Sequence, residues 1–193
     1  NPAVEELLDE VLDIARLVIA PVAVYNTFDI KEVDSDRVSL AGTKLELKGR
    51  GISRFMSSCA RVSLIAATIG DEIDSEIARL FKIDNSSRAV MLDAAGSDAV
   101  EQVISWVDNL IQQEARKEGY STLHRVSPGY SLWSLEGNDM IAKALDASKI
   151  GIEVLPSFEM LPRKSVMAAI GWVPKSIITE ADSGAADTNP DNG

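Results

Sequence analysis

Residues 61–69 read RVSLIAATI, an apolar run that is rich in β-branched side chains. A run of this length, bounded by turn residues, predicts a buried strand at the centre of a sheet. Gly70 ends the strand, and Asp71 is suited to cap a helix immediately after it. The inner face of that helix is expected to hold Ile73, Ile77, Leu80 and Phe81.

The segment before this strand predicts a helix, a hairpin and a second, shorter helix. Apolar residues recur at helical spacing over residues 4–20, with acidic residues on the other side, and Pro21 closes the helix. The period then changes, because apolar and polar residues alternate around Ala41-Gly42-Thr43, which predicts a β-hairpin. A short helix is expected over residues 52–58. The amphipathic first helix needs a partner surface.

The longest predicted helix begins near Ser86 or Ser87 and runs to about Lys117, before Gly119. By the 100° step of a helix it carries two distinct faces. The apolar stripe is expected to consist of Leu92, Gly96, Ala99, Val103, Trp106 and Leu110. A second, narrower face places Glu101 among the small residues Ala94, Ser97 and Ser105, where another backbone could approach closely.

The C-terminal third continues the mixture of helices and strands. A turn at Pro128-Gly129 precedes an expected helix over residues 135–145 and two strands over 150–155 and 165–173. Because the elements do not follow a strict βαβ alternation, an α+β fold is favoured over a doubly wound one. We expect a mixed or antiparallel twisted sheet flanked by helices.

Domain organisation is indicated by the change in composition near the C-terminus. Residues 1–180 are expected to form a single domain. Residues 181–193, ADSGAADTNPDNG, are small, polar and turn-forming without an apolar period, which predicts a disordered acidic tail.

The composition excludes several classes of protein. The 193 residues include 30 acidic and 19 basic side chains, a formal net charge of -11 that argues against binding nucleic acid or an anionic membrane surface. No apolar stretch approaches the length of a spanning helix, and no secretory signal is visible, so a cytoplasmic protein is expected. The lone Cys59 excludes an intramolecular disulfide and a Cys-based zinc site, and the lone His124 excludes a His-rich metal centre.

Common catalytic motifs are absent, and one segment is rich in binding chemistry instead. Residues 124–130 read HRVSPGY. Pro128 and Gly129 suit a turn in which Gly129 has a positive φ. Arg125 offers a planar fork for a carboxylate, and Tyr130 adds an apolar face with a hydroxyl. From the residues alone, a site for an amino-acid or nucleotide-like ligand and a plain surface turn are equally good interpretations.

Three further residues carry groups capable of chemistry. Glu101 has no basic neighbour at helical spacing to pair with, and an exposed glutamate is the more ordinary interpretation. His124 could act as a base, although a polar residue at a strand end is favoured. Cys59 has no activating group nearby in sequence, which favours buried packing over a nucleophile.

A family resemblance rests on two segments, the turn itself and a longer stretch on its C-terminal side. The segments RVSPGYSLWSL (125–135) and ALDASKIGIEVLPSFEMLPRKSVMAAIGW (144–172) resemble the C-terminal activation domain of cobalamin-dependent methionine synthase. Small stand-alone proteins related to that domain are more similar still. The shared pattern is Arg-x-x-x-Gly-Tyr, an Ile-Gly strand and a Pro-x-x-Ser-Val segment. Upstream, AATIGDEID (66–74) and AAGSDAVEQV (94–103) fit the family's layout.

The resemblance implies a ligand and a set of site residues. The family binds S-adenosylmethionine and uses it, with an electron from a flavodoxin-type donor, to restore oxidised cobalamin. Arg125 would bind the ligand's carboxylate, Tyr130 would contact the same end, and Gly129 would allow close backbone approach. Leu132 would meet the adenine side, and Glu101 would lie near the sulfonium and ammonium groups.

The same resemblance shapes the functional hypotheses. The leading one is an S-adenosylmethionine-binding accessory subunit that supports reactivation of a cobalamin-dependent methionine synthase or related corrinoid protein, which would itself hold the cobalamin. The family's N-terminal aspartate and long C-terminal extension have no counterpart in this sequence. Two alternatives therefore stand beside it: an interaction module that has lost the ligand, and a binder of another small carboxylate.

Overall fold

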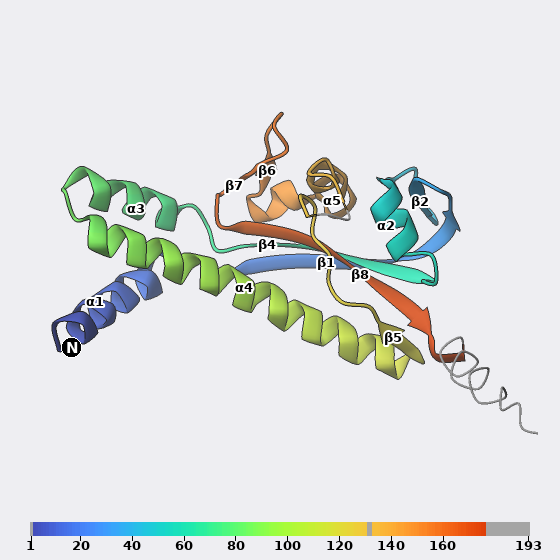
Figure 1. Cartoon of the computed structure of the whole chain (residues 1–193), viewed down its shortest axis with the longest axis horizontal. Coiled ribbons are helices and arrows are strands. Elements are labelled where there is room, and N and C mark those ends of the chain that lie inside the picture. The colour runs from blue at the N-terminus through green and yellow to red at the C-terminus, as the bar shows by residue number, and fades with distance from the viewer. Residues whose placement is uncertain (1, 131–132, 177–193) are drawn as a thin grey trace, which may run out of the picture.

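The computed structural model describes residues 2–130 and 133–176, which form a curved antiparallel sheet with helices on both faces (Figure 1). The six-stranded sheet has the order β3-β2-β1-β4-β8-β5, and β6 and β7 form a separate small hairpin. The strands are β1 (Val22–Val33), β2 (Arg37–Leu40), β3 (Glu46–Lys48), β4 (Arg61–Thr68), β5 (Tyr120–Thr122), β6 (Glu153–Val154), β7 (Met160–Leu161) and β8 (Ser165–Pro174). The helices are α1 (Pro2–Val18), α2 (Arg50–Phe55), α3 (Glu72–Lys82), α4 (Ser86–Lys117), α5 (Gly137–Leu145) and the 3-10 helix η1 (Ala147–Ile150).

The α+β class, the antiparallel sheet and its central strand are confirmed. β4 pairs with β1 on one edge and with β8 on the other, and its residues from Val62 to Thr68 are all buried. Strands covered on both faces carry apolar residues at successive positions instead of alternating ones, which explains the uninterrupted run in the sequence.

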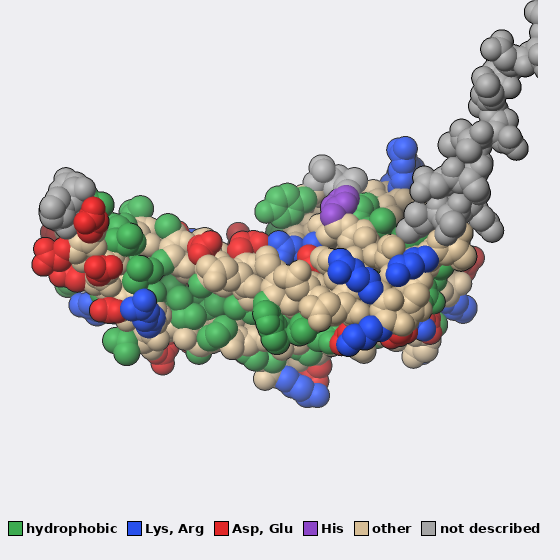
Figure 2. Space-filling model, turned by 90° about the horizontal axis from the view of Figure 1, so that it is seen from below, with side chains coloured by type: hydrophobic (Ala, Val, Ile, Leu, Met, Phe, Trp, Pro, Cys, Tyr) green, Lys and Arg blue, Asp and Glu red, His purple; other side chains and the backbone are tan. Residues whose placement is uncertain are grey.

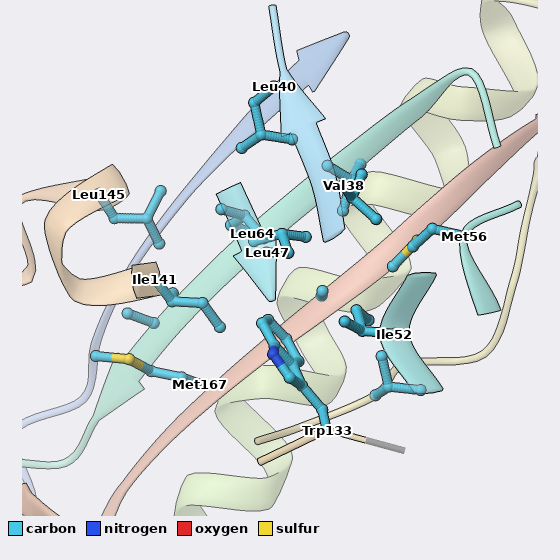
Figure 3. Packing of buried hydrophobic residues seen from close by; sticks show 14 of the residues in the cluster. Val38, Leu40, Leu47, Ile52, Met56, Leu64, Trp133, Ile141, Leu145 and Met167 are labelled. Atoms are coloured by element: carbon cyan, nitrogen blue, oxygen red, sulfur yellow. The ribbon is translucent and has the colours of Figure 1, made fainter. Parts of the chain in front are cut away.

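One face of the central strands β4 and β8 is covered by α2, by α5 and by apolar side chains of the β2–β3 end of the same sheet. Figure 3 shows the hairpin, both helices and the loop residue Trp133 converging on side chains of β4 and β8. Trp133 is only 2% exposed and fills the centre of this layer. The predicted hairpin around residues 41–43 is thereby confirmed, since β2 and β3 pair antiparallel.

The opposite face packs against α4, which crosses the sheet diagonally (Figure 1). The alternate residues of β4 and β8, including Ile65 and Ile170, meet α4 residues such as Ile104 and Ile111 in a second apolar layer. Beyond the end of the sheet, α1 and α3 pack on the first half of α4. Gly96 makes this approach possible, because a Cβ there would lie 2.6 Å from Ile73 Cδ1.

The structure corrects four of the expectations from sequence. The longest strand, β1, was not predicted, because both of its faces are partly covered and no clean alternation marks it. The strand expected over 150–155 is instead the end of η1 followed by the two-residue β6. Leu92 and Gly96 of the predicted α4 stripe are buried, but the buried stripe then continues through Val100, Ile104, Val107 and Ile111, and Trp106 is 64% exposed. On α3, Phe81 is 49% exposed and lies outside the buried face.

The expected tail of residues 181–193 lies outside the described residues. In the described part of the chain, no helix combines the length and apolar character that crossing a bilayer requires.

Candidate functional site

The segment between β5 and the turn is anchored to the edge of β8. The Leu123 N–H donates to the Gly171 carbonyl at 2.9 Å. Val126 exchanges backbone hydrogen bonds with Ala169 in both directions, at 3.0 and 2.8 Å. Arg125 lies between these two anchored residues, so its backbone position is set by the most deeply buried part of the sheet.

The turn after this segment has the conformation that the sequence predicts. Gly129 has a φ of 90°, in the left-handed region that glycine adopts most readily. Its N–H donates to the Trp133 carbonyl at 2.9 Å, and the Trp133 N–H donates to the Tyr130 carbonyl at 2.9 Å. Because Trp133 is buried, these bonds tie the turn to the core. Tyr130 itself is 76% exposed.

Arg125 and Glu101, which the sequence suggests as separate ligand contacts, bind each other. The Arg125 Nη2 donates to Glu101 Oε2 at 2.8 Å. The pair joins the loop to α4 across 24 residues of sequence, so helical spacing could not reveal it. The side chain of Arg125 is 23% exposed and that of Glu101 is 55% exposed.

The guanidinium of Arg125 retains binding capacity beyond this pair. Its Nη1 atom is buried and has no hydrogen-bond partner within the described part of the chain. A buried donor without a partner is costly, so an acceptor that reached Nη1 would gain more than an ordinary surface contact. The Arg125 guanidinium therefore bonds Glu101 through Nη2, while its Nη1 has no partner among the described residues.

A hollow of about 500 Å³ opens beside this pair. Six of the lining residues come from α4 and from the anchored loop and turn, and the seventh comes from β8. They are Glu101, His124, Arg125, Val126, Ser127, Tyr130 and Val166. The hollow thus combines a cation, an anion, an aromatic ring and hydroxyl groups in one place. Leu132, also expected at the site, lies outside the described residues.

Lys164 extends the row of polar contacts along α4, and the sequence did not reveal it. Its Nζ lies 2.8 Å from both Asp93 Oδ1 and Ser97 Oγ, and only 12% of its side chain is exposed. Asp93, Ser97 and Glu101 occur at four-residue spacing, so they share one side of α4. Lys164 therefore packs against α4 through polar contacts and is not a solvated surface lysine.

The two remaining candidates from sequence, Cys59 and His124, have simple environments. Cys59 is 8% exposed, and burial raises the pKa of its thiol to about 11, so it remains a protonated packing residue as predicted. His124 is exposed and meets the Phe55 ring edge-to-face, with the centroids 4.7 Å apart. Within the described ranges, no cluster of His, Cys, Asp and Glu side chains is arranged to hold a metal.

A second arginine cluster lies at another part of the sheet. Arg61, at the start of β4, donates to Asp29 Oδ1 at 2.8 Å and also bonds Glu118 at the end of α4. Its guanidinium carbon lies 5.1 Å from the ring centre of Tyr120 and 5.9 Å from that of Trp172. These contacts raise the pKa of Arg61, the bond to Glu118 contributing most. They border a polar hollow of about 650 Å³.

Comparison with known proteins shows that a solved structure shares this fold. No protein-family model and no curated protein match this sequence. Among solved structures, the chain is similar to the crystal structure of the MetH reactivation domain bound to AdoHcy, with a TM-score of 0.68 and 15% identity. The chain has the fold of the MetH reactivation domain. The similarity covers 88% of this chain and 65% of that chain, so this chain spans only about two thirds of its neighbour's length.

Proposed function

We propose that this protein binds S-adenosylmethionine or a closely related adenosyl amino acid in the hollow beside Arg125. The observation that carries the proposal is the Arg125 guanidinium, which is held by buried backbone, faces the hollow and has an unpaired buried Nη1. A carboxylate is the acceptor that best matches a guanidinium fork. The solved neighbour with this fold binds AdoHcy, which has an amino-acid carboxylate of this kind.

The residues of the hollow fit the rest of an amino-acid ligand. Glu101 supplies a negative charge for an ammonium or sulfonium group next to the carboxylate. A ligand with both charges would exchange the Arg125–Glu101 pair for two new ones, leaving neither side chain unpaired. Tyr130, exposed at the rim, offers a ring face for the apolar part of the ligand. Gly129, beside Tyr130, would let a ligand approach the backbone closely, as the resemblance implies.

The accessory role is inferred from the family resemblance and from the solved neighbour, which is named as a reactivation domain. When bound, S-adenosylmethionine supplies a methyl group. We propose that the protein holds this donor for the reductive remethylation of a cobalamin carried by a partner corrinoid protein or methionine synthase, with a flavodoxin-type electron donor. The contribution of this chain is then to bind and orient the ligand through Arg125, Glu101 and Tyr130.

Calorimetric titration of the purified protein with S-adenosylmethionine and S-adenosylhomocysteine tests the binding proposal. We expect saturable binding that Arg125→Ala weakens by about 10- to 100-fold, the loss expected for a charged hydrogen-bond pair. Arg79→Ala is the matched control, because Arg79 also pairs with a nearby glutamate, Glu76, but lies on α3, away from the hollow. Absence of binding by the wild-type chain, or equal binding by Arg125→Ala, would contradict the proposal.

One observation favours an alternative, a module that keeps the fold for protein contacts alone. Arg125 and Glu101 already neutralise each other without a ligand. If this is their whole role, Arg125→Ala leaves partner binding and reactivation in a corrinoid system unchanged. Competition distinguishes a third possibility, a protein that binds another small carboxylate, from the proposed function. In that case methionine and simple carboxylates would displace a bound probe at least as effectively as the adenosyl ligands.

A further inference from the structure

We propose that the protein forms a symmetric dimer in which the free edge of β1 pairs antiparallel with the same edge of a second copy. The sheet order places β1 between β2 and β4, yet β2 pairs only with the last part of β1, from Ile30 to Val33. Residues 22–28 pair with β4 on one side. No strand of the described chain pairs with their other side.

The direction of the backbone groups along this edge is set by the hydrogen bonds at its end. The Ile30 N–H donates to the Ala60 carbonyl on the β4 side, whereas the Asp29 carbonyl accepts from Ala41 on the outer side. Because the groups alternate along a strand, the odd-numbered residues of the regular stretch 22–29 point their N–H and C=O outward. Ala23 and Tyr25 therefore present both groups on the free edge. The outward N–H of Thr27 is bound by the Asn26 side chain at 2.9 Å.

The free stretch lacks the features that normally prevent strand edges from pairing. Its sequence is VAVYNTF, without a charged residue or a proline. Edge strands that must stay unpaired are usually short, charged or bulged. The two outer strands of the sheet fit that description: β3 (Glu46–Lys48) carries charge at both ends, and β5 (Tyr120–Thr122) has three residues.

A second copy fits this edge because the free stretch is symmetric about an outward-pointing residue. Pro21, which has no N–H, bounds it at one end, and the occupied carbonyl of Asp29 bounds it at the other. Tyr25 lies midway. Antiparallel pairing about Tyr25 joins the Tyr25 groups of the two copies and brings each Ala23 N–H to the other copy's Thr27 carbonyl. A two-fold interface requires this kind of self-complementarity.

The helix beneath the edge adds an apolar surface at the same place. Val103, Trp106, Leu110 and Glu114 form one row on α4 by helical spacing. At one end of that row, Glu114 accepts a hydrogen bond from the Tyr25 hydroxyl at 2.8 Å, and at the other end Val103 packs against the same apolar layer as Ala23 and Tyr25. Trp106, between them, is 64% exposed. Figure 2, which views the molecule from below Figure 1, shows apolar side chains spread over the α1–α4 face.

Sedimentation velocity on the full chain tests this dimer. We expect a dimer that Ala23→Pro converts to monomer, because the substitution removes an outward N–H and no bond to β4. Trp106→Glu should also favour the monomer, whereas Val90→Glu, a matched control at an exposed apolar residue earlier on α4, should not. Since each chain has a net charge of -11, added salt should tighten the dimer by screening repulsion.

Cysteine cross-linking tests the register independently of stability. In a Cys59→Ala background, Tyr25→Cys should form a disulfide-linked dimer on mild oxidation, because facing residues at the two-fold axis lie about 5.5 Å apart between Cα atoms. Asn26→Cys, whose side chain points to the other face, should not. A monomer at all concentrations would overturn the proposal. So would a dimer that Ala23→Pro and Trp106→Glu leave intact, which would indicate another interface. Pairing only with an added peptide or another protein would also overturn it.

Discussion

Arg125 and Arg61 have similar surroundings, but only Arg125 has a buried guanidinium nitrogen without a partner among the described residues. Each pairs with a glutamate on or at the end of α4, Glu101 and Glu118 respectively, and their side chains are exposed to a similar extent, 23% and 29%. Arg61 also binds Asp29 and lies near two aromatic rings, so two of its nitrogens bond carboxylates. Arg125 has one carboxylate partner and a buried Nη1 without one. We therefore expect Arg61 to contribute mainly to stability and Arg125 mainly to the proposed ligand binding.

The strongest test of this comparison substitutes each arginine in turn and measures both stability and ligand affinity. Arg61→Ala should lower the free energy of unfolding by about 2 kcal/mol, because it removes charged hydrogen bonds and packing on the Tyr120 and Trp172 rings. Its affinity for S-adenosylmethionine should stay unchanged. Arg125→Ala should lose affinity and keep its stability. Urea unfolding and calorimetric titration of both variants measure the four quantities. Equal effects of the two substitutions on both quantities would remove the distinction.

Alkaline pH offers a second way to separate stability from ligand affinity, because it ionises Cys59, which does not line the hollow beside Arg125. The folded pKa of about 11 exceeds the ordinary value of 9.0, so the folded chain holds the thiol proton more tightly than the unfolded chain does. The resulting stability is complete below pH 9 and is lost as the pH rises through 11. At pH 10 the loss is about 1.4 kcal/mol by proton linkage.

Cys59 does not line the hollow beside Arg125, so its ionisation should lower stability and leave the residues of the hollow in place. Urea unfolding of the wild-type chain and of Cys59→Ala between pH 8 and 10.5 measures the difference. A Cys59→Ala variant with the same alkaline loss would show that another group causes it.

The turn at Gly129 should affect both quantities to a smaller degree. Gly129→Ala places a Cβ at a φ of 90° and 3.0 Å from Leu135 Cδ1, which should cost about 1 kcal/mol of stability. Because the turn carries Tyr130, ligand affinity should also fall severalfold even though Arg125 is untouched. Gly119→Ala, at a φ of 85° with open space around it, is the matched control for strain alone. Equal affinity losses in the two variants would show that the turn at Gly129 has no specific part in ligand binding.

The smallest expected effect concerns Glu101. With half of its side chain exposed, its attraction for a ligand cation is screened by water, so Glu101→Gln should weaken S-adenosylmethionine binding by about threefold. A ligand that carries only a carboxylate should bind equally well or better, because Glu101 no longer competes for Arg125. Titration of the variant with both ligands checks the opposite signs. A parallel loss for both ligands would mean that Glu101 only positions Arg125.

The parts of the fold that could be predicted from sequence are those with a single strong local signal. The run at 61–69 indicated the central strand because both of its faces are buried, and the long helix over 86–117 was clear from its length and capping residues. β1 was missed because its two faces are unequally covered along its length. On α4 the predicted stripe was rotated toward Trp106, because the sequence does not show which side of a helix meets the sheet.

The ligand contacts of the candidate site stay a prediction, and the contacts that its residues make within the protein could not be read from the sequence. The Arg-x-x-x-Gly-Tyr pattern located Arg125, Gly129 and Tyr130, and the structure brings all three to one turn. The ion pair between Arg125 and Glu101, and the contacts of Lys164 with Asp93 and Ser97, join segments far apart in the chain. No spacing rule covers such pairs, because they depend on how α4 crosses the sheet.

The position of β4 has a consequence for hydrogen exchange. β4 is bonded along both edges and covered by apolar layers on both faces, so its amide protons should exchange with solvent only when the whole domain unfolds. The exchange rates of amides from Val62 to Ala67 then report global stability directly, residue by residue and without denaturant. In β1, by contrast, the outward amide of Ala23 should exchange rapidly in a monomer while its neighbour Val24 remains protected.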